Sequence, residues 1–106
     1  MPRRQEQLAH ALRDIVAQFL SQIVEFEHDV LVTVTRTEVT SDGRSATIFI
    51  SALPETYGES ALHAITPHLY DLQGRVNASL GRRSSPRIQF ALDPALTVIN
   101  QQQTSS

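Results

Sequence analysis

The chain of 106 residues contains no cysteine and no lysine, and only 6% of its residues are aromatic. Without cysteine, neither a disulfide framework nor a cysteine-ligated zinc site can form, and small secreted domains usually depend on disulfides. No apolar run is long enough to cross a bilayer, and the residues after Met1 lack the continuous apolar segment of a signal peptide. These absences indicate a cytoplasmic protein with no membrane partner.

The basic residues are unevenly distributed along the chain. All nine are arginine, whose planar fork suits phosphate contacts, although a genomic coding bias would explain the choice equally well. Between Asp71 and Asp93 the chain holds four arginines and no acid: Arg75, Arg82, Arg83 and Arg87. We expect them to form a phosphate-contacting patch, extended by Arg3 and Arg4, rather than a solvated strand edge that discourages strand addition.

The other polar and aromatic residues limit where nucleic acid would bind. Glu25, Glu27 and Asp29 crowd the segment after the first predicted helix, where they would repel a phosphate backbone. We expect three phenylalanines in the core, namely Phe19, Phe49 and Phe90. Tyr57 and Tyr70 then remain to meet a base, so recognition should depend on backbone charge and shape more than on base reading.

Residues 32–51 predict two strands joined by a tight turn. Apolar and polar residues alternate with a period of two on both sides of the turn, with Val32 and Val34 before it and Ala46, Ile48 and Ile50 after it. In the turn, Asp42 can bond its own backbone and Gly43 tolerates a positive φ. The segment therefore predicts an antiparallel hairpin.

Helical patterns flank this hairpin. Apolar residues at spacings of three and four predict an amphipathic helix over residues 5–24. A second helical stretch begins near Gly58 and is interrupted at Pro67, where Thr66 is a candidate N-cap, so we expect two helices that meet at a kink. Residues 87–92 predict a third strand, and residues 99–106 predict a polar, disordered tail after a single domain of residues 1–98.

Two groups of residues resemble the ribosome-binding factor A family. The first lies in the predicted hairpin and comprises Val32, Thr33, Val34, Thr35, Glu38, Val39, Asp42, Ala46 and Ser51. The second keeps the spacing of an R-x-x-P-x-x-x-F-x-x-D-x-x-L pattern through Arg83, Pro86, Phe90, Asp93 and Leu96. The two patterns occur in the family's order and at its separation, and the resemblance covers nearly the whole chain.

The resemblance implies an α+β fold: a single KH-like domain of the second topological type, in the order α-β-β-α-kink-α-β. KH domains generally clamp the nucleic-acid backbone with a GXXG loop. This chain contains no GXXG, as the family implies, but it also departs from the family's interrupted Ala-x-Gly at the kink. Counted back from Pro86, those positions are His68, Leu69 and Tyr70, so Pro67 would supply the kink by another device.

Four histidines invite a catalytic or metal-binding hypothesis. His63 and His68 are five residues apart, whereas two ligands on one helical face need a spacing of three or four. His10 and Asp14 are one helical turn apart and are expected to form a solvated pair, and His28 lies in the acidic segment. No motif combines a nucleophile, a base and an oxyanion donor, so we expect no enzyme, no cofactor, no metal and no small-molecule substrate.

The family resemblance implies a non-enzymatic assembly factor that binds immature small (30S) ribosomal subunits, assists late 16S rRNA maturation and is associated with cold adaptation. The residues expected to contact RNA are Arg75, Arg82, Arg83, Arg87, Arg3, Arg4 and Tyr70. Two alternatives remain open: a general KH-like RNA-binding module outside ribosome assembly, and a small protein-interaction domain. We expect a monomer, since one core accounts for the apolar residues.

Overall fold

The computed structural model describes residues 3–81, 83 and 85–94. Its elements are α1 (Arg3–Ile23), β1 (Leu31–Val39), β2 (Ser45–Leu53), a 3₁₀ turn η1 (Glu55–Tyr57), α2 (Gly58–Ile65), a second 3₁₀ turn η2 (Thr66–His68), α3 (Leu69–Leu80) and β3 (Arg87–Leu92). This order confirms the predicted sequence of elements. The predicted tail, residues 99–106, lies outside the described residues, so the domain boundary at residue 98 stays a prediction.

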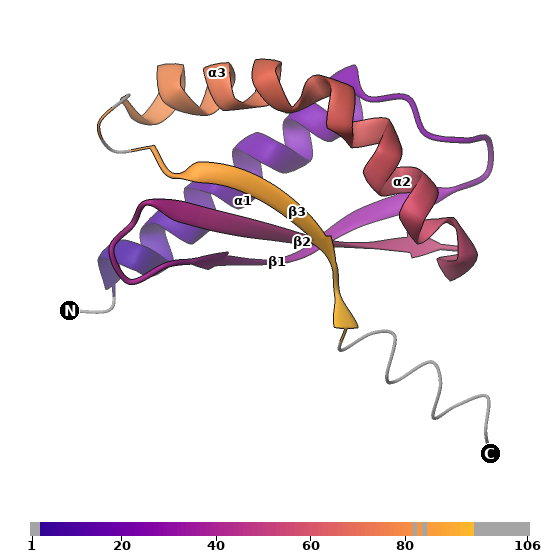
Figure 1. Ribbon diagram of the computed structural model, residues 1–106, viewed down its shortest axis with the longest axis horizontal. Helices are drawn as coiled ribbons and strands as arrows, with labels where there is room; N and C mark the ends of the chain where they lie inside the picture. Colours follow the sequence, from indigo (N-terminus) through magenta and orange to yellow (C-terminus); the bar gives the residue numbers. More distant parts are fainter. Residues whose placement is uncertain (1–2, 82, 84, 95–106) are drawn as a thin grey trace.

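The three strands form one sheet in the order β1-β2-β3. β1 pairs antiparallel with β2, and β2 pairs parallel with β3. Among the described residues, α1, α2 and α3 lie on one side of this sheet, as Figure 1 shows, and they leave its other face open. The molecule therefore has two layers, one of helices and one of strands.

The core lies between the helices and the central strand. Inward-facing residues alternate along β2, where Ile48 and Ile50 are fully buried. α1 covers them with Leu12 and Val16, which are also fully buried, as the predicted amphipathic stripe requires. Side chains of α2 and α3 complete the cluster with Ile65, Leu72 and Val76. Each such side chain contributes roughly 1.5–3 kcal/mol on burial, so this cluster fixes the helices on the sheet.

The β1–β2 turn is built as its residues predict. The hydroxyl of Thr40 donates to the Asp42 carboxylate at 2.7 Å, and the same carboxylate oxygen accepts the Arg44 backbone N–H at 3.0 Å. Gly43 has a φ of 73°, which a residue with a Cβ adopts only at a cost. The antiparallel hairpin is therefore confirmed, and its turn is held by side-chain hydrogen bonds.

The predicted kink is present between α2 and α3. The chain forms the 3₁₀ turn η2 at Thr66–His68, with Pro67 near its start, before α3 begins. The predicted role of Thr66 as an N-cap is wrong, because its hydroxyl donates back to the Leu62 carbonyl at 2.9 Å within α2. The proline interrupts the helix, and the threonine satisfies a carbonyl of the preceding turn.

The prediction that Phe49 lies in the core is wrong. It alternates with the buried Ile48 and Ile50, so its side chain projects from the open face of the sheet. There the guanidinium Cζ of Arg36 lies 4.0 Å from the ring centroid. Phe19, by contrast, is 2% exposed, and Phe90 packs partly buried against the core.

Candidate nucleic-acid interface

Three segments that are distant in the sequence meet at one end of the molecule. The side-chain amide of Gln5, in the first turn of α1, donates to the carbonyls of Thr40 and Ser41 in the β1–β2 turn, at 3.1 and 2.9 Å. At the start of β3, the backbone N–H of Arg87 donates to the carbonyl of Arg44 at 2.8 Å. The β1–β2 turn thus connects the first turn of α1 with the first residue of β3.

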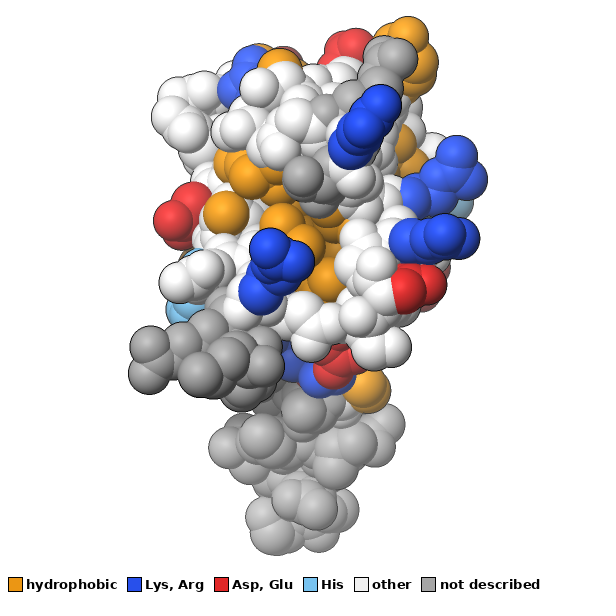
Figure 2. Space-filling model, turned by 90° about the vertical axis from the view of Figure 1, so that its left-hand side faces the viewer, with side chains coloured by type: hydrophobic (Ala, Val, Ile, Leu, Met, Phe, Trp, Pro, Cys, Tyr) orange, Lys and Arg blue, Asp and Glu red, His pale blue; other side chains and the backbone are white. Residues whose placement is uncertain are grey.

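We call this surface the arginine end and define it by Arg4, Arg44, Arg83 and Arg87. All four residues are exposed, and they come from α1, the β1–β2 turn, the α3–β3 connection and β3. Figure 2 looks at this end and shows arginine side chains around a patch of hydrophobic side chains. Within residues 3–81, 83 and 85–94, no ion pair joins any of these four arginines to an acid. Their charges are therefore available to phosphate groups.

Arg44 is a member of this end that the sequence pattern did not single out. It follows Asp42 and Gly43, the two residues whose chemistry favours a turn. Only the parallel pairing of β2 with β3 brings it next to Arg87, with Ser45 opposite Arg87 in the register. The spacing of Arg44 and Arg87 along the chain does not predict that the two residues are neighbours.

One acid belongs to the same turn. Hydrogen bonds from the Thr40 hydroxyl and the Arg44 backbone N–H hold the pKa of the exposed Asp42 carboxyl below its usual value of 3.8, with a smaller contribution from the Arg44 charge. These bonds direct the carboxylate into its own turn. Asp42 therefore shapes the turn that presents Arg44, and its negative charge weakens the local positive field only in part.

The remaining predicted contact residues are not all brought together. Arg75 lies on α3, where its Cζ is 5.3 Å from the ring centroid of Phe19 in α1. Tyr70 is 89% exposed in the first turn of α3, and the helix rise separates it from Gly81 at the far end by about 16 Å. The side chain of Arg3 and the whole of Arg82 lie outside the described residues. Tyr70 therefore stands apart from the arginine end.

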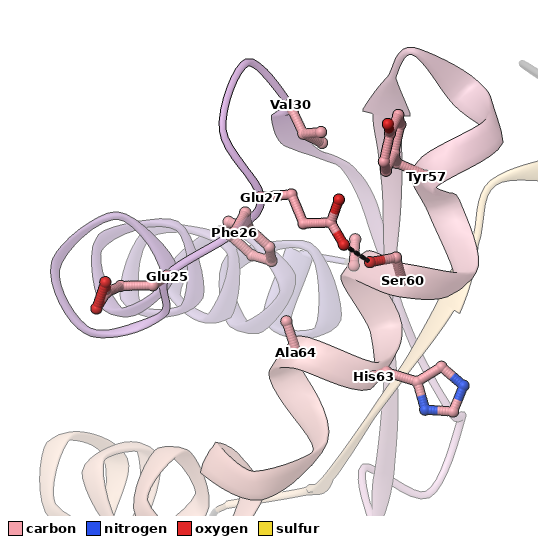
Figure 3. Close-up of a pocket in the computed structure, with 9 residues that line it drawn as sticks. Glu25, Phe26, Glu27, Val30, Tyr57, Ser60, His63 and Ala64 are labelled. Carbon is pink, nitrogen blue, oxygen red and sulfur yellow. Dashed lines mark hydrogen bonds between the residues drawn. The ribbon is translucent and has the colours of Figure 1, made fainter.

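The opposite end of the molecule is acidic and carries a pocket of about 310 Å³. In Figure 1 the α1–β1 loop lies at the right, whereas the β1–β2 turn lies at the left. The pocket is lined by Glu25, Phe26, Glu27, Val30, Tyr57, Ser60, Ala61, His63 and Ala64. Figure 3 shows the Glu27 carboxylate directed at Ser60, whose hydroxyl donates to it at 3.1 Å, while the Glu25 carboxylate points away. The acidic loop therefore does not neutralise the arginine end.

The described part of the chain offers neither a metal site nor a membrane span. No group of three or more of its His, Asp or Glu side chains is arranged to hold a metal ion. None of the helices in residues 3–81, 83 and 85–94 has the length and apolar character that crossing a membrane requires.

Comparison with known proteins places this geometry in a family. The model of the family described as "Ribosome-binding factor A" matches residues 4–104. The chain is 35% identical over 99 residues to a ribosome-binding factor A of Gemmatimonas aurantiaca, covering 89% of this chain and 66% of that protein. It is 32% identical over 101 residues to a ribosome-binding factor A of Prochlorococcus marinus, covering 90% of this chain and 80% of that protein. The chain spans less than two thirds of the length of three of its relatives: the Gemmatimonas protein, one of Salinispora arenicola at 60% and one of Mycobacteroides abscessus at 61%.

Solved structures agree with the fold. A crystal structure of ribosome-binding factor A from Thermus thermophilus superimposes with a TM-score of 0.68 at 22% identity, covering 83% of this chain and 93% of that chain. A Thermus thermophilus model fitted into a cryo-EM map of a 30S complex gives a TM-score of 0.57 at 23% identity, covering 86% and 92%. These likenesses confirm the α+β, KH-like fold. Together with the match over residues 4–104, they show that the chain belongs to the ribosome-binding factor A family.

Proposed function

We propose that the protein is a non-enzymatic, cytoplasmic factor that binds immature small (30S) ribosomal subunits and assists late maturation of their 16S rRNA. Family membership supports the ribosomal partner, and the Thermus thermophilus member has been fitted into a map of a 30S complex. The chain's own contribution to the proposal is a surface suited to an RNA backbone.

The observation that carries the proposal is the arginine end. Gln5 and Arg87 fix α1 and β3 to the β1–β2 turn, so arginines from separate segments lie at the same end of the molecule. Arginine binds phosphate with a planar fork of donors, and such contacts position a protein on RNA without reading its sequence. The surface is therefore suited to the shape and charge of folded rRNA.

Binding alone is enough for such a factor to act. A protein that prefers one conformation of the rRNA shifts the population toward it by the ratio of its two affinities. The factor would hold a maturing conformation and would leave when the completed subunit no longer presents it. This step uses no covalent chemistry, so the exposed arginines supply what it needs.

Titration with purified immature small subunits at several salt concentrations tests the proposal. Arg44→Gln and Arg87→Gln should each weaken binding and lower the slope of log affinity against log salt by about 0.7 to 0.9, the effect of losing one phosphate contact. Arg13→Gln is the matched control, because Arg13 is exposed on α1 outside the arginine end. It should leave the slope unchanged.

Sedimentation of the tagged protein with cell lysate gives an independent test. Co-migration with immature small subunits at low salt, lost at high salt, is the expected result. Migration only at the top of the gradient would refute the proposal. Equal binding to many structured RNAs would instead favour a general KH-like RNA-binding module outside ribosome assembly.

The pocket at the acidic end favours a second candidate function, protein interaction. It combines the Glu27 carboxylate with the Phe26 and Tyr57 rings, a chemistry that suits a basic side chain. Glu27→Gln would weaken capture of a protein partner, whereas binding of the subunit through the arginine end should survive that change.

We also expect the protein to be a monomer, which sedimentation equilibrium at low concentration should show.

A further inference from the structure

The open face of the sheet carries one stack of side chains that the arginine end does not include. Because Ile48 and Ile50 face the helices, Phe49 and its register partner Arg36 project on the other side. The Arg36 Cζ lies 4.0 Å from the centroid of the Phe49 ring, which places the guanidinium over the ring. The face thus presents a flat cation on top of an aromatic ring.

Two carboxylates hold this guanidinium in place. Arg36 forms an ion pair with Glu38, its neighbour on the same face, and its Nε lies 3.7 Å from Oδ2 of Asp93. Asp93 is 6% exposed, so it is a fixed anchor, whereas the Arg36 side chain remains 42% exposed. The two carboxylates restrain the guanidinium plane of Arg36 at its edges. The face of the guanidinium that points away from Phe49 remains open to solvent.

This arrangement is better suited to stacking than to phosphate binding. Two nearby carboxylates offset the charge of Arg36, so a phosphate gains little there. A guanidinium plane still stacks on the face of a nucleobase, as aromatic side chains do. In a chain with few exposed aromatic rings, the stack of Arg36 on Phe49 can therefore receive a nucleobase. We call this stack the platform.

The platform is continuous with the arginine end. In the β2–β3 register, Arg87 lies opposite Ser45, Gln89 opposite Thr47 and Ala91 opposite Phe49. Since Ile88 is buried, these alternate residues of β3 share the open face with Phe49. Four residues of strand separate Arg87 from the Phe49 row, about 13 Å. One extended RNA strand can therefore cross from phosphate contacts at Arg87 to the stack.

A polar pair lies between the two. The side-chain amide of Gln89 donates to the Thr47 hydroxyl at 3.0 Å, which uses one of its hydrogens. The amide retains a second N–H and a carbonyl oxygen that can meet the edge of a base. The open face thus offers stacking and hydrogen bonding beside a phosphate site.

We propose that the open sheet face binds unpaired RNA, with one base stacked on the outer side of the Arg36 guanidinium. This proposal rests on the proposed RNA-binding function and adds a base contact to its backbone contacts. It predicts a preference for single-stranded over fully paired rRNA segments, because a base within a duplex cannot reach the platform.

The test compares two fluorescein-labelled RNA 12-mers that carry the same phosphates, one with all its bases and one with abasic sites in its central half. The parent protein should bind the complete 12-mer about tenfold more tightly, as expected for one to two stacked bases. Arg36→Lys keeps the charge but removes the plane, so this variant should bind both oligomers equally weakly. Phe49→Leu should behave in the same way.

Arg87→Gln is the matched control, because it removes a phosphate contact and no stacking surface. It should weaken binding to both oligomers by the same factor and lower the salt slope by about 0.7. Thermal unfolding of each variant measures stability separately.

Three outcomes would overturn the proposal. The parent protein could bind both oligomers equally, it could bind neither, or Arg36→Lys could keep the parent's preference for bases while changing only the unfolding temperature. In the last case Arg36 merely shields Phe49 from water. Sedimentation with small subunits decides the proposed function independently. Particle binding that is weakened by Arg44→Gln but unchanged by Arg36→Lys would leave that function standing without the platform.

Discussion

The carboxylate of Asp93 accepts a hydrogen bond of 2.6 Å from the hydroxyl of Thr35, a residue 58 positions earlier. Thr35 is the extra residue at the bulge of β1, where the register with β2 shifts between Val34 and Arg36. Asp93 directly follows β3, and its own backbone N–H donates to the carbonyl of Ile50 in β2 at 3.0 Å. The contact therefore connects the end of β3 with an irregular point of β1 across the sheet.

Thr35→Val should destabilise the protein by about 1.5–3 kcal/mol, since it removes a hydrogen bond to a buried charged group. Thr33→Val on the same strand is the control, because Thr33 is exposed and should change stability by no more than about 0.5 kcal/mol. Urea unfolding followed by circular dichroism measures both free energies. Equal stability of the two variants would show that the Thr35 contact adds nothing.

At the outer edge of β3, the Gln73 side chain forms hydrogen bonds with backbone groups that a neighbouring strand would otherwise satisfy. The Gln73 amide on α3 donates to the Pro86 carbonyl at 2.9 Å, and its oxygen accepts the Ile88 backbone N–H at 2.9 Å. Gln73→Ala leaves both backbone groups without this partner, and we expect a loss of about 2 kcal/mol or more in the free energy of unfolding. The exposed Gln7→Ala on α1 should stay within about 0.5 kcal/mol of the parent protein.

Local sequence patterns were sufficient to predict the helices, strands and turns of this fold. The period of two predicted the hairpin, Asp42 and Gly43 predicted its turn, and Pro67 predicted the break between α2 and α3. Each of these signals acts within a few residues of the chain, because backbone geometry and hydrogen bonding at a turn are local properties. The boundaries of α1 and β3 followed to within two residues.

Contacts between distant segments could not be predicted in the same way. The arginine end depends on the pairing of β3 with β2, which brings Arg87 to Arg44. The position of Phe49 depends on which face of β2 the helices cover, since alternation defines two faces but does not say that an aromatic residue lies outside. The stacking of Arg36 on Phe49 likewise became visible only in three dimensions.

Replacing Gly74 and Gly81, in the C-terminal half of the chain, by alanine should change the free energy of unfolding in opposite directions. Gly81 ends α3 with φ 86° and ψ 137°, a conformation that strains any residue with a Cβ, so Gly81→Ala should cost about 1–3 kcal/mol. Gly74 lies inside α3, and a Cβ there would meet no atom within 4 Å, so Gly74→Ala should stabilise by about 0.5–1 kcal/mol. Thermal and urea unfolding of the pair test this; a stabilising Gly81→Ala would contradict the backbone argument.

The Asp42 carboxyl makes stability depend on pH in acid. Its pKa in the folded protein lies below the 3.8 of an unperturbed aspartate, first because Thr40 donates to it and next because the Arg44 N–H does. A lowered folded pKa stabilises the protein above the unfolded pKa, and this contribution is lost as the pH falls through the folded pKa. Thr40→Val should therefore move the Asp42 pKa upward, toward 3.8, and should reduce the acid dependence of the free energy of unfolding.

Two measurements on Thr40→Val separate the causes of the lowered Asp42 pKa. NMR titration of the Asp42 carboxyl follows the pKa itself, and urea unfolding between about pH 2 and 5 follows the free energy of unfolding. Ser41→Ala is the control, because the Ser41 contact at this turn uses its backbone carbonyl, and the Asp42 pKa should not move. A titration unchanged by Thr40→Val would assign the lowered pKa to the Arg44 N–H and charge instead.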